Sequence, residues 1–349
     1  MEITKKSLGS WPADGVEEVM ACPICGSKKR SLLYEELTDK IFFCAPGEWK
    51  LYRCDSCESG YLNPRPTPET IGMAYTNYFT HHSEEVDEMS GFRKLRRALA
   101  NGYHNKKYGT NKSPSNIFGY WLAMLLPSQR AFLDAAMRHL PHPQPGNRLL
   151  DVGCGSGDFL MHAMDAGWEV IGVDPDPKAV EMTHSRSLDV RYGGIDAVSD
   201  MQESFDGITL SHVIEHVHDP LSLLNECYRL IKPGGWIWIE TPNINALGHC
   251  HFKNNWRGLE PPRHLVIFNH TSLKKSLINI GFCDIKDMPH RNIYTSLYSA
   301  NLAIRQGCTD IDNRLTLVQR VRCLLPNLYE KQNPEIREFI TIKCHKPNI

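Results

Sequence analysis

Two pairs of cysteines near the amino terminus have the residue type and spacing of a metal site. Cys22 and Cys25 form one Cys-x-x-Cys pair, and Cys54 and Cys57 form the other. Each pair can bend into a tight loop that directs two thiolates at one ion, and four thiolates complete the tetrahedral shell of a structural zinc site. The spacing therefore predicts one bound Zn²⁺, with unmetallated thiols or a single redox-active pair as the alternative.

A glycine-rich turn in the middle of the chain has the composition of a ligand-binding loop. In "LLDVGCGSGDFL", Gly153, Gly155 and Gly157 alternate with other residues shortly after Asp151. Missing side chains let backbone N–H groups and the start of the next helix approach a ligand closely. A dinucleotide site requires glycine at the last position of G-x-G-x-x-G, and Asp158 occupies it here. The carboxylate of Asp151 suits an ammonium group better than a pyrophosphate.

Two further acidic residues follow the next two predicted strands. Asp174 ends "WEVIGVD", where a carboxylate can accept hydrogen bonds from both hydroxyls of a ribose. Asp196, in "GGIDAV", could accept a hydrogen bond from an adenine amino group. An amino-acid moiety, a ribose and an adenine together predict S-adenosylmethionine as the ligand.

The elements that must position these residues alternate between helix and strand from about residue 128 onward. Strands are predicted at "NRLLDVG", "EVIGVD", "LDVRYGG", "FDGITLSHV", "GWIWIET", "FCDIKDM" and "FITIKCH", with helices between them. This alternation predicts an α/β fold, with a Rossmann-like seven-stranded and mostly parallel sheet covered by helices on both faces. In such sheets, ligands bind beyond the carboxyl ends of the strands, where the glycine turn and the acidic residues fall.

The amino-terminal segment has its own pattern. "KRSLLYEEL" and "EWKLYRC", between the cysteine pairs, have the alternating apolar character of short strands and predict a zinc ribbon. Tyr75 and Tyr78, further along, could close over the ligand or simply pack. The predicted divisions are a zinc-ribbon-like module at 1–68, a helical linker or cover segment at 69–127, and a Rossmann-like domain at 128–349 with an insertion at about 291–335.

As a set, these motifs resemble the class I S-adenosylmethionine-dependent methyltransferases. The matching stretches are "LLDVGCGSG", "GVDPDP", "FDGITLSHVIEHVHDP", "LIKPGGWIWIETPN" and "PPRHLVIF", between about residues 145 and 290. The resemblance implies that cofactor-binding residues lie at the ends of four strands. They are Asp151, Gly153, Cys154, Gly155 and Gly157; Asp174 and Pro175; Asp196 and Ala197; and Ser211 and His212.

Methyl transfer to a hydroxyl needs an acceptor held in line and a base for its proton. The predicted catalytic residues are His264 and, within "HVIEH", Glu215 and His216. Their spacing partly resembles metal-assisted hydroxyl methyltransferases of small RNAs and of ubiquinone synthesis, in which carboxylates and histidines hold a divalent ion. His212 stands where that pattern has a carboxylate, which argues against a hard cation such as magnesium. A purely structural role for these histidines is the remaining alternative.

Composition limits the partners and the compartment. The net charge of −1 provides no overall basic surface for holding a nucleic acid. The chain has no run of about 18 apolar residues and no secretory signal, which predicts a cytoplasmic protein without a transmembrane segment. Its 12 cysteines are too dispersed over 349 residues for a disulfide scaffold.

Three functions are compatible with these features. The first is methyl transfer to oxygen or carbon of a small molecule, sugar or lipid-linked glycan, because a ribbon joined to such a core resembles bacterial enzymes of surface-glycan and secondary-metabolite pathways. The second is RNA methylation, in which the ribbon and a basic run would hold the substrate. That run comprises Arg93, Lys94, Arg96, Arg97, Lys106 and Lys107. The third is a non-catalytic zinc-binding adaptor, against which the intact glycine turn and Asp174 argue.

Overall fold

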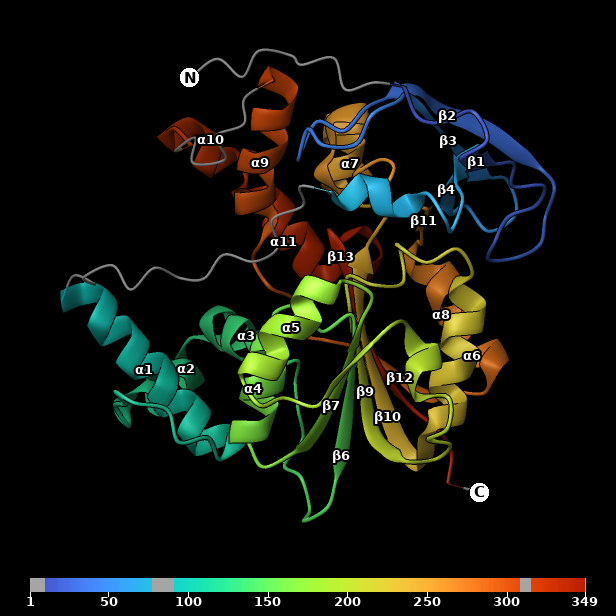
Figure 1. Cartoon of the computed structure of the whole chain (residues 1–349). Helices are drawn as coiled ribbons and strands as arrows, with labels where there is room; N and C mark the ends of the chain where they lie inside the picture. The colour runs from blue at the N-terminus through green and yellow to red at the C-terminus, as the bar shows by residue number, and fades with distance from the viewer. Residues whose placement is uncertain (1–9, 77–90, 308–314, 349) are drawn as a thin grey trace.

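Seven strands form the central sheet of the computed structural model, which describes residues 10–76, 91–307 and 315–348 (Figure 1). They pair in the order β12-β13-β10-β9-β6-β7-β8, and only β13 runs antiparallel to its neighbours. The predicted fold class is therefore confirmed. The strands are β6 (Arg148–Val152), β7 (Glu169–Asp174), β8 (Val190–Tyr192), β9 (Phe205–Ser211), β10 (Ile231–Pro242), β12 (Cys283–Asp287) and β13 (Phe339–His345).

Helices lie on both sides of this sheet in Figure 1. One side carries α3 (Pro127–Ala136), α4 (Asp158–Asp165) and α5 (Pro177–Ser185); the other carries α6 (Pro220–Leu230) and α8 (His270–Ile280). Local sequence explains where α6 starts, because the Asp219 carboxylate accepts from the Ser222 N–H at 2.9 Å and Pro220 takes the first helical position. The central strands β6, β9 and β10 bury apolar side chains on both faces, as a covered parallel sheet requires.

The ribbon strands form a second sheet above the first. Its members are β2 (Arg30–Leu37), β3 (Trp49–Cys54), β4 (Gly60–Leu62) and β11 (Val266–Ile267), in the order β11-β4-β3-β2. The two strands predicted between the cysteine pairs are confirmed. β11 comes from far along the chain, directly after the segment that contains His264, and pairs antiparallel with β4. A short pair, β1 (Val16–Glu17) with β5 (Arg65–Pro66), and the 3₁₀ helix η1 (Ile71–Tyr75) complete this part.

Helices form most of the described residues in the predicted cover segment and the predicted insertion. In the cover segment, α1 (Gly91–Tyr108) and α2 (Phe118–Leu125) cross so closely that a Cβ atom on Gly102 or Gly119 would collide with backbone of the other helix segment. The insertion contains α9 (Tyr294–Gln306), α10 (Leu317–Arg322) and α11 (Leu324–Gln332), and α7 (Leu247–Phe252) follows β10. Within the described ranges, no helix combines the length and apolar character that crossing a membrane requires.

Candidate cofactor and acceptor site

The glycine turn connects β6 to α4 and lies against the carboxyl end of β7. Gly153, Gly155 and Gly157 have φ values of +68°, +52° and +77°, in the left-handed region that favours glycine. The Gly155 N–H donates to the Asp174 carboxylate at 2.8 Å, so the turn and the predicted ribose acceptor are in direct contact. A Cβ atom on Gly155 would meet no other atom within 4 Å, so the space beside this residue is open, whereas Gly153 and Gly157 lie close to Val213 and Leu188.

Asp151 is fully buried at the end of β6. Its Oδ1 atom pairs with the Arg138 guanidinium and accepts from the Thr209 hydroxyl at 2.8 Å, whereas Oδ2 has no hydrogen-bond partner among the described residues. Burial raises the pKa of Asp151, although Arg138 and Thr209 oppose the shift. An unpaired buried carboxylate oxygen beside an open glycine turn fits the ammonium group of an amino-acid moiety. The sequence patterns do not single out Arg138, whose backbone has a φ of +45° just after α3.

The remaining predicted cofactor residues lie at the same edge of the sheet. Asp174 is buried and also accepts from the Asp176 N–H at 2.9 Å. Its backbone carbonyl accepts from the Gly193 N–H at 3.0 Å, which brings the exposed Asp196 and the half-buried Ala197 of η2 (Ile195–Val198) toward the end of β7. The other predicted positions flank these or end β9: they are Cys154, Pro175, Ser211 and His212. The structure thus collects the predicted residues along one edge, and their binding roles stay predictions.

A cavity of about 300 Å³ opens beyond the ends of β9 and β10. Its walls come from the β9–α6 loop, the long segment after β10, helix α9 and the approach to β13. The lining residues are His212, His216, Pro242, Trp256, Arg257, Gly258, Glu260, His264, Leu297, Glu338 and Phe339. Leu297 belongs to α9, so the insertion reaches this cavity.

His212, predicted as a cofactor contact, lies in the cavity wall between two carboxylates. Its Nδ1 atom is 3.3 Å from Glu215 Oε1, and its Nε2 atom is 3.5 Å from Glu240 Oε1. Burial disfavours the charged ring, but the two carboxylates outweigh that effect and raise the pKa of His212 to about 10. Glu240 also pairs with Arg291. His212 is therefore an imidazolium at neutral pH, and neither Glu240 nor Arg291 is evident from a local motif.

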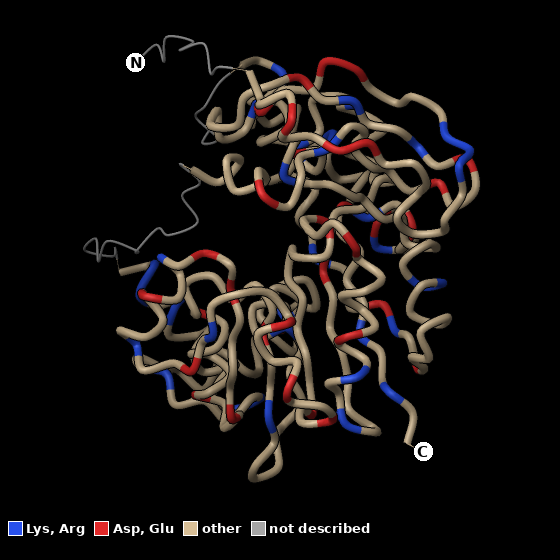
Figure 2. Tube along the Cα trace, turned by 45° about the vertical axis from the view of Figure 1, so that its right-hand side comes forward, with Lys and Arg blue, Asp and Glu red and all other residues tan. Residues whose placement is uncertain are grey.

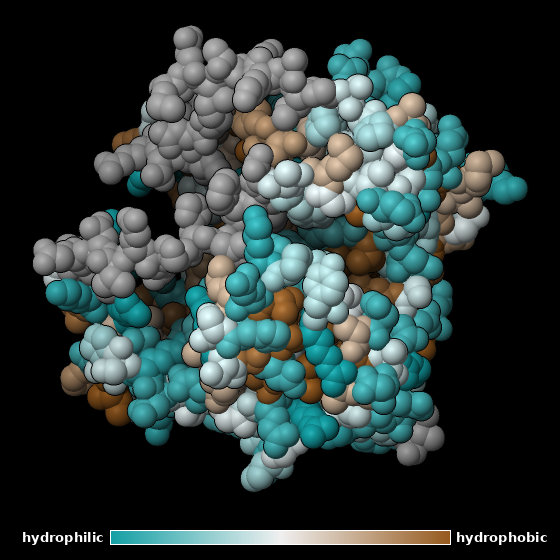
Figure 3. Space-filling view, viewed as in Figure 1, coloured by the Kyte–Doolittle hydropathy of each residue, from teal (hydrophilic) through white to brown (hydrophobic). Residues whose placement is uncertain are grey.

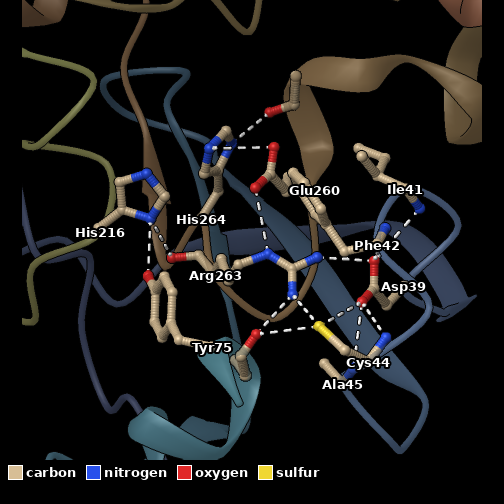
Figure 4. Close-up of polar contacts among 12 residues, drawn as sticks. Asp39, Ile41, Phe42, Cys44, Ala45, Tyr75, His216, Glu260, Arg263 and His264 are labelled. Atoms are coloured by element: carbon tan, nitrogen blue, oxygen red, sulfur yellow. Dashed lines mark hydrogen bonds and ion pairs between the residues drawn. The ribbon is translucent and has the colours of Figure 1, made fainter. Parts of the chain in front are cut away.

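His264 and His216 lie against each other, with ring centroids 4.7 Å apart (Figure 4). His264 Nδ1 is 2.8 Å from the Gly258 carbonyl oxygen, which can only accept, so Nδ1 carries the proton and Nε2 holds the lone pair. Burial lowers the pKa of each imidazole to about 4, and both are neutral at pH 7. Glu215, His216 and His264 each offer an atom within 4.8 Å of the others, so the three could also hold a metal ion.

Arg263 ties the segment before β11 to the amino-terminal part of the chain (Figure 4). It is fully buried, with Nη2 2.7 Å from Asp39 Oδ1 and Nε 3.1 Å from Glu260 Oε1, and its Nη1 donates to the Ala74 carbonyl at 2.8 Å. Removing one member of a buried ion pair typically costs about 3–5 kcal/mol, because the partner charge is left uncompensated. This cluster therefore fixes the backbone next to His264.

The two tyrosines predicted to close over the ligand have different outcomes. The Tyr75 hydroxyl is 3.0 Å from His216 Nδ1, so this side chain contacts the histidine pair. Tyr78 lies outside the described residues. Whether Tyr75 also covers a cofactor stays a prediction.

The four amino-terminal cysteines converge on one point. Their sulfur atoms all lie within 4.8 Å of one another, with Cys22 Sγ 3.6 Å from Cys57 Sγ and Cys25 Sγ 3.5 Å from Cys54 Sγ. A tetrahedral zinc site with Zn–S bonds of about 2.3 Å places its sulfur atoms roughly 3.8 Å apart. The arrangement therefore fits a zinc ion.

The six basic residues of the predicted RNA grip do not gather at the cavity. Arg93, Lys94, Arg96 and Arg97 are exposed in the first half of α1, whereas Lys107, near its end, donates to the buried Asp134 at 2.6 Å. In Figure 2, Lys and Arg are interspersed with Asp and Glu over the upper part of the molecule around the ribbon. The structure thus shows no single basic surface that joins the described part of the ribbon, α1 and the cavity.

Comparison with known proteins agrees with this site. Residues 127–286 match the family model of a methyltransferase domain. A ubiquinone biosynthesis O-methyltransferase from Paracidovorax citrulli is 37% identical over 112 residues, covering 30% of this chain and 47% of that protein. The enzyme of the same name from Pseudomonas putida is 42% identical over 108 residues, covering 29% and 46%. This chain thus spans about half the length of these relatives.

Among solved structures, an S-adenosylmethionine-dependent methyltransferase from Archaeoglobus fulgidus aligns with a TM-score of 0.44 and 24% identity, covering 65% of this chain and 100% of that one. A likeness of this degree does not extend the assignment. The family match covers the glycine turn, the acidic strand ends and the histidine segment described above. Residues 127–286 of this chain therefore form a methyltransferase domain.

Proposed function

We propose that this chain transfers a methyl group from S-adenosylmethionine to a small-molecule, sugar or lipid-linked glycan acceptor bound in the cavity of about 300 Å³. The observation that carries the proposal is the neutral, buried His264, whose Nδ1 proton is committed to the Gly258 carbonyl. An imidazole lone pair in a cavity beside the cofactor edge is what deprotonation of an acceptor requires, and Nε2 lies 4.0 Å from Glu260 Oε2. The names of the relatives favour oxygen over carbon as the methylated atom.

In this proposal, one set of side chains binds the cofactor and another acts on the acceptor. S-adenosylmethionine, when bound, supplies an electrophilic methyl group on a sulfonium centre. Asp174 accepts hydrogen bonds from the ribose hydroxyls, and the open turn at Gly155 accommodates the amino-acid end near Asp151 and Arg138. His264 Nε2 takes the acceptor proton as the acceptor oxygen attacks. These roles follow from the positions at the strand ends and from the donor and acceptor chemistry of each group.

A metal-assisted version uses the same three residues differently. Glu215, His216 and His264 would hold the ion, and the ion would act as a Lewis acid on the acceptor oxygen. Two imidazoles and one carboxylate suit zinc or iron better than magnesium. Both oxygens of Glu215 already have partners, since Oε1 faces His212 and Oε2 accepts from the Thr241 hydroxyl at 2.9 Å. We therefore favour His264 as a base.

Labelling of cellular fractions tests the function. The protein is incubated with S-adenosylmethionine that carries a labelled methyl group and with separated small-metabolite, lipid and RNA fractions. The proposal expects label in the metabolite or lipid fraction, with transfer that changes little with salt because a small cavity, not a charged surface, holds the acceptor. Label confined to RNA, with transfer that falls steeply as salt rises, would favour the RNA alternative instead.

We further propose that Cys22, Cys25, Cys54 and Cys57 bind one structural Zn²⁺. Metal analysis of the purified protein should find one zinc ion per chain, and Cys54→Ser should lose it, whereas substitution of the exposed Cys250 should not. Activity should fall together with the zinc, because the ribbon sheet continues through β11 next to His264. A second ion that disappears in His264→Gln would support the metal-assisted version, and no zinc in the wild-type protein would refute the ribbon site.

A further inference from the structure

The segment from α1 to the start of α3 has an unusual charge distribution. Residues 91–133 contain 8 Lys or Arg residues and no Asp or Glu, in a chain with 39 basic and 40 acidic residues. Arg93, Lys94, Arg96 and Arg97 are all exposed on the first two turns of α1. A stretch this one-sided in a nearly neutral protein is a local electrostatic feature that methyl transfer does not require.

The same segment exposes large apolar side chains. Ile117, Phe118, Trp121 and Leu125 are 65%, 71%, 63% and 77% exposed, and residues 117–126 contain no charged side chain. On α1, Phe92 is 70% exposed. A soluble monomer rarely leaves a group of this size in water without a partner. Figure 3 shows brown side chains at the lower left edge of the molecule, where Figure 1 places α1 and α2.

The basic and apolar side chains lie on adjoining helices, because α1 and α2 are in close contact. The Asn116 N–H donates to the Ala98 carbonyl at 2.8 Å, and Gly119 lies against the Leu99 backbone. Leu95, which is 50% exposed, lies one turn before Leu99 on α1. The exposed start of α1 therefore adjoins the start of α2, and we call this surface the α1–α2 face.

We propose that the α1–α2 face docks on an anionic phospholipid bilayer. Trp, Phe and Leu side chains would enter the boundary between headgroups and acyl chains, and the Lys and Arg side chains would meet the lipid phosphates. A strand of RNA matches the charge but not Ile117, Leu125 and their aliphatic neighbours, since single-stranded nucleic acids are held by isolated stacking aromatics in polar grooves. Docking of this kind goes beyond the proposed methyl transfer and does not depend on it.

A second face of the same composition supports this proposal. Leu317 and Val321 on α10, and Leu325 and Leu328 on α11, are between 55% and 79% exposed. Arg320 lies among them and is itself exposed. Figure 1 shows α10 on the same side of the molecule as α1 and α2. The exposed side chains of α10 can therefore approach the same extended surface as the α1–α2 face, as a bilayer presents.

Vesicle sedimentation of the full-length protein tests the docking. The probes are vesicles of phosphatidylglycerol and phosphatidylcholine in equal parts, and vesicles of phosphatidylcholine alone. We expect binding to the anionic vesicles to be at least about tenfold tighter, because each basic residue near an anionic surface contributes roughly fivefold. A double substitution Phe118→Ser and Trp121→Ser should weaken binding at least about tenfold. A double substitution Arg93→Glu and Arg97→Glu should weaken it about 25-fold or more.

The matched control lies on α8 and changes the same side-chain types elsewhere. Lys275 and Ile278 are exposed there, and the double substitution Lys275→Glu and Ile278→Ser should leave vesicle binding unchanged. All three variants change exposed side chains, so their thermal unfolding should match the wild-type protein. Equal binding to both kinds of vesicle, or equal loss in the control, would overturn the proposal. The proposal would also be overturned if the wild-type protein were a dimer and the double substitution Phe118→Ser and Trp121→Ser made it monomeric without changing vesicle binding. Binding of RNA without any binding of vesicles would overturn it as well.

Discussion

Asp174→Ala is expected to abolish S-adenosylmethionine binding in titration calorimetry while the protein remains folded. The carboxylate is the predicted acceptor of both ribose hydroxyls, and a hydrogen bond to a charged group contributes about 1.5–3 kcal/mol. Losing two such bonds lowers affinity by at least about 100-fold. The substitution also removes the acceptor of the Gly155 N–H, which adds to the loss by releasing the turn.

Two variants separate ribose binding from support of the turn. Asp174→Asn keeps an oxygen for the Gly155 N–H but removes the charge, so we expect it to bind the cofactor more weakly than wild type and more tightly than Asp174→Ala. Asp176→Ala removes a nearby carboxylate that caps α5 through the Lys178 N–H at 2.9 Å. It should cost about 1 kcal/mol of stability and leave affinity nearly intact. Wild-type affinity in Asp174→Ala would refute the site assignment.

His264→Gln should lower kcat by about 10²–10⁴-fold, the usual contribution of a general base. Cofactor affinity should not change, because His264 lies in the cavity beyond β10 and not at the glycine turn. Once the labelling experiment has supplied an acceptor, steady-state kinetics with that acceptor measure the effect. KM for the acceptor should change much less than kcat.

The control for His264 is a second buried histidine from the same long segment. His249 lies outside the residues lining the cavity and bonds Tyr34 at 2.9 Å. His249→Gln removes a comparable buried imidazole, so it should reproduce any loss that comes from packing alone. Equal kcat losses in both variants would assign His264 a structural role, and an unchanged kcat in His264→Gln would exclude it as the base.

Local patterns predicted the parts of this molecule that short stretches of chain determine. The seven strands, the left-handed turn at Gly153 to Gly157 and the convergence of four cysteines all follow from period, glycine placement and spacing. Arg138, which pairs with Asp151, and Glu240, which pairs with His212, belong to no such pattern. The first pair joins a loop residue to the following strand across 13 positions, and the second joins residues on either side of α6, so neither partner can be read from local spacing.

Long-range contacts that local patterns do not predict also hold the segment around Arg263 and His264. The sequence singles out His264, but it gives no sign that Arg263 would be neutralised by Asp39, more than 200 residues away. A strand of only two residues, Val266–Ile267, also has no sequence pattern from which its place in the ribbon sheet could be predicted. Strand pairing across such distances depends on the closure of the whole chain, which local propensity does not encode.

The shared strand β11 also limits how this protein could have been assembled or could be rebuilt. If all strands of the ribbon sheet came from the amino-terminal segment, that segment could be removed or transferred to another protein by a single break in the linker that follows it. Here such a break would separate β11 from β4 and expose the unpaired edge of β4. It would also leave the buried Arg263 without its ion-pair partner Asp39. We therefore expect that the amino-terminal ribbon cannot be removed without destabilising the segment that contains His264.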